Sequence, residues 1–274
     1  MKEQIAIHID DLGASEGGDS CLNENLLQYP NLTCSVIAKL ENIDYLQNVL
    51  FPKLSAWGGK LFVHLNLLEG SPLIVAKKAV PRTPWLYLLY SFFPIRFRNR
   101  LFDYKKAHSE LSTQIRFFQN SVIGNQIVGI DGHMHLHLFP SLRPVTEKLL
   151  VEFPFLKIRI IDEKFSLPLL KKFKFRYLKG IPKLILLRSW SSNLAEKYPN
   201  RVVIFTGVNQ IGLAGLDNAT ISTVGKENTP LILHPNYDAQ FPASHGPRLA
   251  KFYASVEREK EKAALNQYLE RVGI

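Results

Sequence analysis

The chain has 274 residues, of which 46% are hydrophobic and 11% aromatic, and this composition excludes an intrinsically disordered protein. Its 34 Lys and Arg against 24 Asp and Glu leave a formal net charge of +10. The two cysteines, Cys21 and Cys34, are too few for a disulfide framework or a four-thiolate zinc site. We therefore expect both to be buried free thiols.

The N-terminus leads directly into a strand pattern and has no signal-peptide features, which favours a cytoplasmic protein. The most apolar stretch, 85–95, is about half of the roughly 20 residues that cross a bilayer, and Pro94 interrupts it. The sequence therefore predicts no transmembrane segment.

Seven short apolar runs predict β-strands in chain order, and the longer mixed stretches between them predict helices. Apolar residues occur on both faces of these runs, which is typical of parallel strands buried on both sides. This pattern favours an α/β fold, as a barrel or a doubly wound sheet, over a β-sandwich. The runs are 5–9, 33–37, 61–65, 127–131, 156–160, 202–205 and 231–233.

Four prolines interrupt the segment 71–106, which is rich in Trp, Tyr, Phe and Arg. We expect it to be an inserted lid or partner surface, or a long loop with short helices that packs on the fold. Near the C-terminus, charged and apolar faces predict a helix over 248–272 with a break near Ser255. Gly273 suits its C-cap.

Residues suited to catalysis lie at the ends of several predicted strands. Asp10 and Asp11 suit either a metal ligand beside a free base or a helix N-cap pair. His64 ends the third strand and His234 follows the last. Because the carboxyl ends of parallel strands form one rim, we expect these groups to converge.

The segment 131–137 carries His133, His135 and His137 at alternate positions. In an extended chain the first and last lie roughly 13 Å apart at about 3.3 Å per residue, so one ion takes one or at most two of them. The others are expected to orient a ligand or to contact substrate. One carboxylate and two imidazoles leave open positions on an ion such as Zn²⁺ or Fe²⁺, where a bound water attacks at neutral pH.

Taken in order, these motifs resemble the YdjC-like (ChbG/HpnK) carbohydrate deacetylase family along nearly the whole chain. The resemblance rests on 10–13, 64–70, 131–140 and the His234-Pro235 step. It implies a single domain, 1–274, with a (β/α) barrel-like fold, a distorted TIM-type barrel. It also implies that a metal-bound water removes an N-acetyl group from an amino sugar or N-acetylated glycan, with Mg²⁺ or Zn²⁺ as the ion.

The resemblance also implies a role for each matching residue. Asp11, His64 and His133 look like the metal ligands. Asp10 looks like the general base, and His234 like the acid that protonates the leaving amine. The remaining candidates are expected to bind substrate or to support the ligands, and they are Glu69, Asp131, His135, His137 and Arg159.

The chain departs from the family pattern at three positions. It has His8 where Asn is usual, Leu12 where Phe is usual, and Gly129 where His is common. The segment 71–106 matches little of the family. These departures leave the three expected ligands intact and bear on the substrate pocket.

Two other functions use the same residue types. A non-haem iron oxygenase also binds its metal through two His and one carboxylate, and an inactive homologue would only bind carbohydrate. The basic, aromatic segments 96–106 and 171–179 suit a solvated face or peripheral contact with a membrane. We expect no nucleic-acid partner, because no nucleic-acid motif accompanies the charge, and a homodimer is compatible with the sequence.

Overall fold

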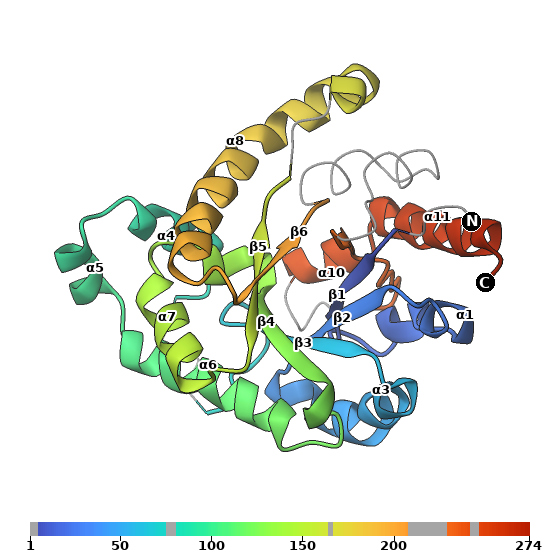
Figure 1. Cartoon of the computed structure of the whole chain (residues 1–274), viewed down its shortest axis with the longest axis horizontal. Coiled ribbons are helices and arrows are strands. Elements are labelled where there is room, and N and C mark those ends of the chain that lie inside the picture. Colours follow the sequence, from blue (N-terminus) through green and yellow to red (C-terminus); the bar gives the residue numbers. More distant parts are fainter. Residues whose placement is uncertain (1–4, 75–80, 164–166, 208–228, 242–246) are drawn as a thin grey trace.

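Seven parallel strands form a nearly closed barrel in the computed structural model of the chain (Figure 1). The structure describes residues 5–74, 81–163, 167–207, 229–241 and 247–274. The strands lie in the order β6-β5-β4-β3-β2-β1-β7. They are β1 (Ile7–Leu12), β2 (Leu32–Val36), β3 (Lys60–Leu65), β4 (Ile127–Gly132), β5 (Lys157–Ile161), β6 (Val202–Phe205) and β7 (Leu231–Leu233).

The two edge strands meet through one backbone bridge. Thr206, directly after β6, pairs in parallel with Leu231 of β7. The Thr206 amide donates to the Pro230 carbonyl at 3.1 Å, and the Ile232 amide donates to the Thr206 carbonyl at 2.9 Å. The expected (β/α) barrel-like fold is therefore confirmed, in preference to a doubly wound sheet.

Helices surround the strands on the outside of the barrel (Figure 1). The α-helices are α1 (Glu24–Leu27), α2 (Ile43–Tyr45), α3 (Phe51–Trp57), α4 (Pro84–Ser91), α5 (Ile95–Leu101), α6 (Tyr104–Gln119), α7 (Arg143–Glu152), α8 (Leu167–Lys197), α10 (Pro247–Tyr253) and α11 (Val256–Val272). Shorter turns are η1 (Gly18–Cys21), η2 (Leu40–Asn42), η4 (Gly124–Gln126) and η5 (His133–Leu138), with a π-helical turn at η3 (Leu46–Leu50).

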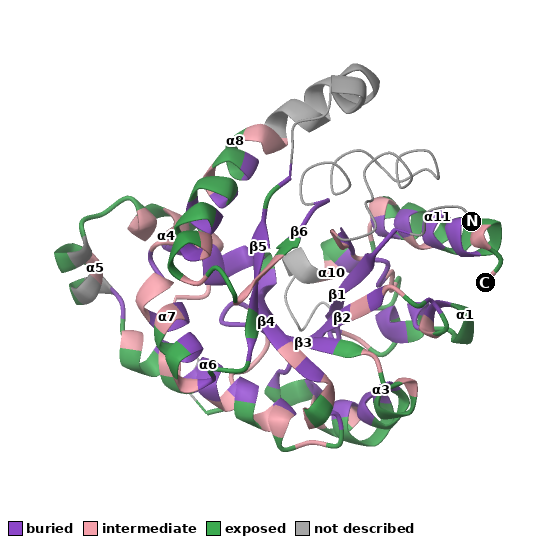
Figure 2. Ribbon diagram, in the orientation of Figure 1, coloured by how far each residue is buried: buried purple, intermediate pink, exposed green. Residues whose placement is uncertain are grey.

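Most of the strands are buried on both faces, as the parity of their apolar residues predicts, whereas in β6 only Phe205 is buried (Figure 2). In β1, Ile7 and Ile9 alternate with His8 and Asp10, and every residue of the strand is buried. Residues two apart share a face of a strand, so the apolar pair and the polar pair face opposite sides. The His8 ring packs against Phe205 of β6, with centroids 4.7 Å apart, which places the polar face inside the barrel.

Several strand boundaries differ by one to three residues from the sequence prediction, and two of the differences affect the predicted site. The first strand covers Ile7–Leu12 and not 5–9, so Asp10 and Asp11 lie within it. The histidine-rich segment is not extended, because β4 ends at Gly132 and η5 begins at once. Met134 and His135 have φ values of 52° and 60° there, so 131–137 is not the extended chain on which the expected spacing of the three histidines was based.

Other predictions agree with the structure. The C-terminal helix is broken at Ser255 as expected, and Gly273 caps α11 in the left-handed conformation with φ 86°. Cys21 and Cys34 are buried free thiols. Within 71–106 the structure describes α4, α5 and the start of α6, whereas 75–80 lie outside the described residues. The charged side chains of 171–179 also lie outside them. None of the described helices is long and apolar enough to cross a membrane.

Two departures from the family pattern fit around one aromatic ring. A Cβ at Gly129 would lie 2.4 Å from the Phe62 ring and 2.9 Å from the Lys157 carbonyl oxygen. Phe62 also packs edge-on against His8, with ring centroids 5.5 Å apart. The Phe62 ring therefore fills the space beside Gly129, and a larger residue there would displace it.

We expect Gly129→Ala to lower the free energy of unfolding by about 1–3 kcal/mol, because the added methyl overpacks the barrel interior. Adding Phe62→Leu should restore part of the loss, since the shorter side chain vacates the ring's position. Urea unfolding of both variants measures this. A Gly129→Ala protein as stable as the wild type would contradict the packing argument.

Asp19 fixes the turn that follows β1. Its carboxylate accepts the Gly13 amide at 2.8 and 3.0 Å and the Tyr45 hydroxyl at 3.0 Å. Burial raises the pKa of Asp19 to about 7, although these donors and Lys39 act to lower it. Since its ordinary value is 3.8, the folded protein binds this proton more tightly than the unfolded chain does.

The sign of the pH effect follows from this raised pKa. Ionising Asp19 costs the folded state more than the unfolded state, so its contribution to stability declines as pH rises from about 4 to about 7. Asp19→Asn removes that dependence. We expect the unfolding free energy of the variant, minus that of the wild type, to rise across this range in urea titrations at several pH values. A difference that is flat with pH would contradict the raised pKa.

Candidate metal centre

A β-bulge at the carboxyl end of β1 turns two adjacent carboxylates into the barrel. The pairing with β2 shifts register between Ile9 and Leu12, so Asp10 and Asp11 stand opposite a single residue of β2. Asp11 has φ 64°, a left-handed conformation that costs a residue other than Gly about 1–3 kcal/mol. Each residue is only 2% exposed. The bulge thus removes the alternation that would send one carboxylate outward.

Asp11, His64 and His133 meet at one point. Asp11 Oδ1 lies 2.9 Å from His64 Nε2 and 2.9 Å from His133 Nδ1. The three side-chain atoms lie within 4.8 Å of one another, and all three residues are buried. Ligand atoms bound to one ion at about 2.0–2.2 Å lie roughly 3–3.5 Å apart, close to these distances, so the group suits a divalent ion. The three ligands expected from the sequence are therefore brought together.

A second carboxylate holds each of these imidazoles from the far side of its ring. His64 Nδ1 lies 2.6 Å from Asp131 Oδ1, and His133 Nε2 lies 3.1 Å from Glu69 Oε1. Such partners fix the ring orientation of a metal-binding histidine and strengthen it as a ligand. Asp131 and Glu69 thus support the imidazoles from behind and do not join the three-atom group.

Carboxylates dominate the electrostatics of this group. Burial lowers the pKa of His64, but Asp131, Asp10 and Asp11 outweigh it and raise the pKa to about 9. Burial also opposes protonation of His133, and Glu69 and Asp11 raise its pKa well above the ordinary range. The centre therefore requires positive charge, which protons on the imidazoles or a bound cation can supply. A metal ion would displace those protons, because only neutral imidazole binds metal.

Asp10 belongs to a neighbouring group that already contains a cation. Arg159 is fully buried on β5, and its Nη1 lies 2.5 Å from Asp10 Oδ1 and 3.0 Å from Asp131 Oδ2. His8 Nε2 lies 3.0 Å from Asp10 Oδ1. Burial would raise the pKa of both carboxyls, but Arg159 and His64 hold both pKa values well below the ordinary range. His8, Asp10 and Asp131 could geometrically hold an ion, yet the guanidinium already neutralises them.

His234 completes the rim beside both aspartates. Its Nε2 lies 3.6 Å from Asp10 Oδ2 and 4.0 Å from Asp11 Oδ2. The side chain is 26% exposed, more than either aspartate. Burial lowers the pKa of His234 despite these carboxylates. Its backbone amide donates to Glu261 Oε1 at 2.5 Å, which attaches the end of β7 to α11.

His135 and His137 have different surroundings. His137 Nε2 donates to the Arg159 carbonyl at 2.9 Å, and the Thr146 hydroxyl donates to the His137 carbonyl at 3.0 Å. Burial lowers the pKa of His137 to about 4. This hydrogen bond therefore attaches η5 to β5, the strand that carries Arg159. His135 is buried, and its Nδ1 has no hydrogen-bond partner among the residues that the structure describes. Substrate binding by His135 stays a prediction.

Ser35 and Tyr253 lie around the centre and were not predicted, and His8 was named only as a departure from the family pattern. His8 and Ser35 bond to each other at 2.7 Å, and Ser35 also donates to Asp131. The signal for His8 was present, since it lies two residues before Asp10 and so shares its face of β1. Tyr253 ends α10 fully buried, and burial together with Asp11 and Glu69 raises its pKa. No sequence pattern marks Tyr253, because α10 reaches the barrel only through the tertiary fold.

Comparison with known proteins gives the same assignment as the motifs. No curated protein matches the chain. Among solved structures, a proposed cellobiose-phosphate cleavage protein from Enterococcus faecalis is 16% identical with a TM-score of 0.58, and the match covers 100% of this chain and 96% of that one. At that identity the likeness shows a shared fold alone. The model of the YdjC-like protein family matches residues 4–268. Because that match spans nearly the whole chain, the protein belongs to the YdjC-like family.

Proposed function

We propose that the protein is a carbohydrate-processing enzyme that uses a divalent metal ion to hydrolyse the N-acetyl group of an amino sugar or N-acetylated glycan. One observation carries the proposal: Asp11, His64 and His133 converge, while Asp10 and His234 lie beside them outside the group. Membership of the YdjC-like family supports the substrate class, since the motifs that it shares resemble those of carbohydrate deacetylases. The neighbour from Enterococcus faecalis is also described in terms of a carbohydrate substrate.

Asp11, His64 and His133 would hold the ion. Two imidazole nitrogens and one carboxylate oxygen are a donor set that suits Zn²⁺ better than Mg²⁺, which prefers oxygen ligands and retains several waters. When bound, such an ion supplies Lewis-acid polarisation of the amide carbonyl and makes water acidic enough to react at neutral pH.

Asp10 has the arrangement of a general base. Its Oδ1 is occupied by Arg159 and His8, and its Oδ2 faces His234 at 3.6 Å. Arg159 and His64 hold its pKa well below the ordinary range against the effect of burial, so the carboxylate is ionised at neutral pH. Arg159 also fixes its orientation, and Oδ2, the oxygen on the side of His234, would accept the water proton.

His234 supplies the proton that the leaving amine needs. An amine departs from a tetrahedral adduct only when it is protonated, so the reaction requires a proton donor as well as a base. Burial lowers the pKa of His234, which makes its protonated form a stronger acid. With Asp10 Oδ2 at 3.6 Å, the proton taken from water has a short path to the imidazole and on to the amine.

The purified protein should release acetate from at least one member of a panel of N-acetylated mono- and oligosaccharides. Exhaustive chelation should abolish release, and Zn²⁺ or Mg²⁺ should restore it. Chelation is also expected to lower the melting temperature, because an ion that binds only the folded state stabilises it.

The matched control is the same panel without oxygen. Undiminished acetate release there agrees with hydrolysis, whereas an absolute requirement for oxygen and Fe²⁺ would favour the oxygenase. Carbohydrate binding without any turnover would identify an inactive homologue. Full activity after metal removal would contradict the assignment of the three ligands.

The adjacent aspartates provide a matched pair of variants. Asp10→Asn should lower kcat by about 10²–10⁴-fold, because the base is lost, while metal content stays at the wild-type level. Asp11→Asn should lower metal content itself, since it removes the only carboxylate of the three ligands. Metal analysis and acetate release on both proteins separate these roles. Wild-type activity in Asp10→Asn would remove the base assignment.

A further inference from the structure

An exposed apolar stripe runs along α4. Trp85, Leu89 and Phe92 are 67%, 50% and 63% exposed, and their spacing of four and three residues places them on one face of the helix. The opposite face is fixed to the protein, since Tyr87 is fully buried and its hydroxyl donates to the Pro81 carbonyl at 2.6 Å. The helix is thus firmly seated, and its solvent side carries large apolar side chains.

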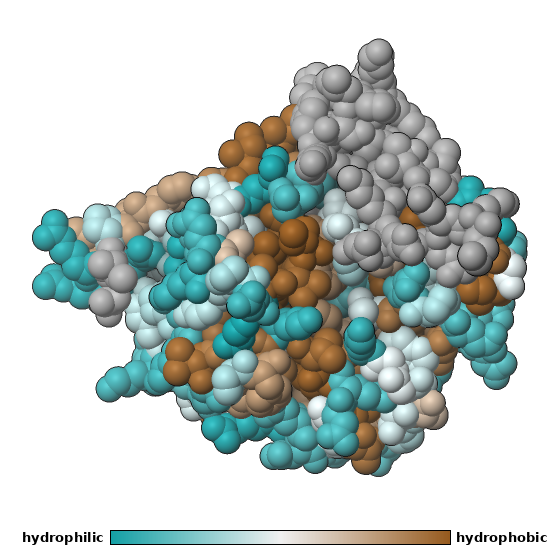
Figure 3. Space-filling model, viewed as in Figure 1, coloured by the Kyte–Doolittle hydropathy of each residue, from teal (hydrophilic) through white to brown (hydrophobic). Residues whose placement is uncertain are grey.

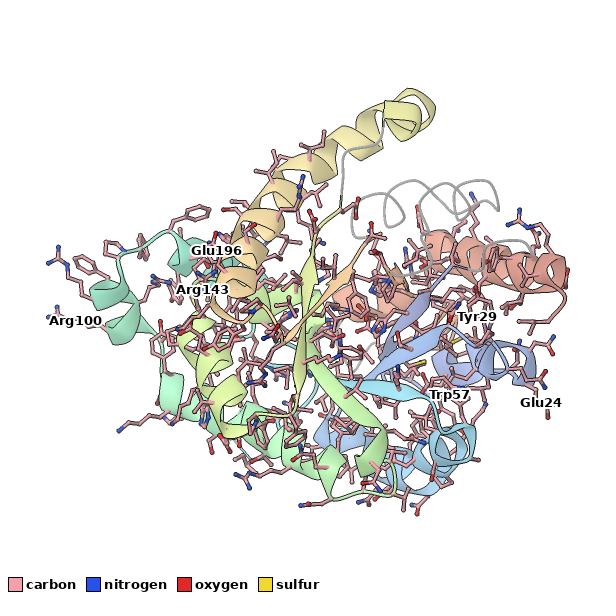
Figure 4. The ribbon with its side chains drawn as sticks, viewed as in Figure 1. Glu24, Tyr29, Trp57, Arg100, Arg143 and Glu196 are labelled. Carbon is pink, nitrogen blue, oxygen red and sulfur yellow. The ribbon has the colours of Figure 1, made fainter. Side chains whose placement is uncertain are left out.

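The adjoining α5 adds arginines to this stripe. Phe97 is 49% exposed, and the Arg96 guanidinium lies over its ring at 5.6 Å from the centroid. Arg100 projects away from the barrel at the tip of α5 (Figure 4). Arg98 donates to the Pro140 carbonyl, which attaches this end of the segment to the barrel. From 84 to 102 the sequence contains no acidic residue.

Scattered exposed apolar residues are ordinary on protein surfaces, whereas a contiguous group marks an interaction site. In Figure 3, hydrophobic surface runs along the edge formed by α4, and hydrophilic side chains gather where α5 ends. The helix α5 projects outward from the barrel (Figure 1). Exposed Trp and Phe side chains bordered by arginines, in a stretch of sequence without acidic residues, suit insertion into a headgroup layer.

We propose that the stripe of Trp85, Leu89, Phe92 and Phe97, together with Arg96 and Arg100, docks this protein on the surface of an anionic lipid bilayer. The aromatic side chains enter the boundary between headgroups and acyl chains. The arginines pair with anionic headgroups, and each contributes to binding at low ionic strength. This inference stands apart from the proposed function, because it uses none of the residues of the metal centre.

The docking surface is joined to the part of the barrel that carries the histidines. Ser91 at the end of α4 lies 3.2 Å, hydroxyl to hydroxyl, from Ser141, and the Ser141 amide donates to the same Ser91 oxygen. Ser141 comes three residues after η5, the turn that holds His133. Docking would therefore hold the barrel in a fixed orientation at the membrane.

Vesicle flotation tests the proposal with the full-length protein. The protein should float with vesicles of phosphatidylcholine and phosphatidylglycerol and remain behind with phosphatidylcholine alone, and added salt should weaken its binding. Phe92→Ser should weaken binding about tenfold, in keeping with the loss of one buried aromatic side chain. Arg96→Gln with Arg100→Gln should weaken binding by a similar factor or more.

Phe155 provides a matched control, because it is 63% exposed, as Phe92 is, and lies outside the stripe. Phe155→Ser should float like the wild type. Trp85 should show a blue-shifted emission on anionic vesicles, and Trp85→Phe should abolish that shift, since Trp190 is buried and the half-buried Trp57 lies on α3, away from the stripe. Circular dichroism of each variant shows whether it is folded.

Three outcomes would overturn the proposal. They are absence of flotation with anionic vesicles, equal loss of binding in the Phe92 and Phe155 variants, and a dimer in solution that the Phe92 variant disrupts. The last result would assign the stripe to a second copy of the chain. Because acetate release is measured with soluble sugars, failure of docking and failure of the proposed activity are distinguishable.

Discussion

A single carboxylate oxygen on a strained bulge connects three distant parts of the chain. Asp11 Oδ1 contacts His64 and His133, which come from β3 and from the turn after β4. The contact exists because the bulge turns Asp11 inward at φ 64°, a conformation that the surrounding barrel must hold in place. Strain of this kind persists where packing overdetermines the backbone, and every residue of β1 is buried.

The two aspartates of the bulge have different electrostatic partners, and this difference separates their chemistry. Asp10 faces the permanent cation of Arg159, so its charge is compensated without an ion. Asp11 Oδ1 contacts two imidazoles, which carry positive charge when protonated and bind metal when neutral. Among the buried carboxylates of the barrel, Asp10 is therefore neutralised by Arg159, whereas the group around Asp11 still needs a proton or a metal ion.

The barrel also holds α4 in place on its outer surface. Phe62 fills the interior beside Gly129 and contacts His8, so the departures from the family pattern are compatible with tight packing around the centre. On the outside, α4 is anchored through Tyr87 and Ser91, which leaves its apolar stripe facing solvent. The metal centre and the α4 surface are therefore both attached to the same barrel.

Local sequence patterns predicted the strands, their parallel character and the residues at their carboxyl ends, because local polarity and strand parity are properties of neighbouring residues. They marked Asp10, Asp11, His64 and His133 as chemical groups, and the motif order pointed to a barrel. The folded barrel was needed to show that β6 and β7 meet, that a bulge turns both aspartates inward, and that 133–138 is a turn. Those features depend on contacts between residues far apart in the chain. For the same reason Arg159 and Tyr253, one on β5 and one at the end of α10, acquire their partners only when the barrel closes.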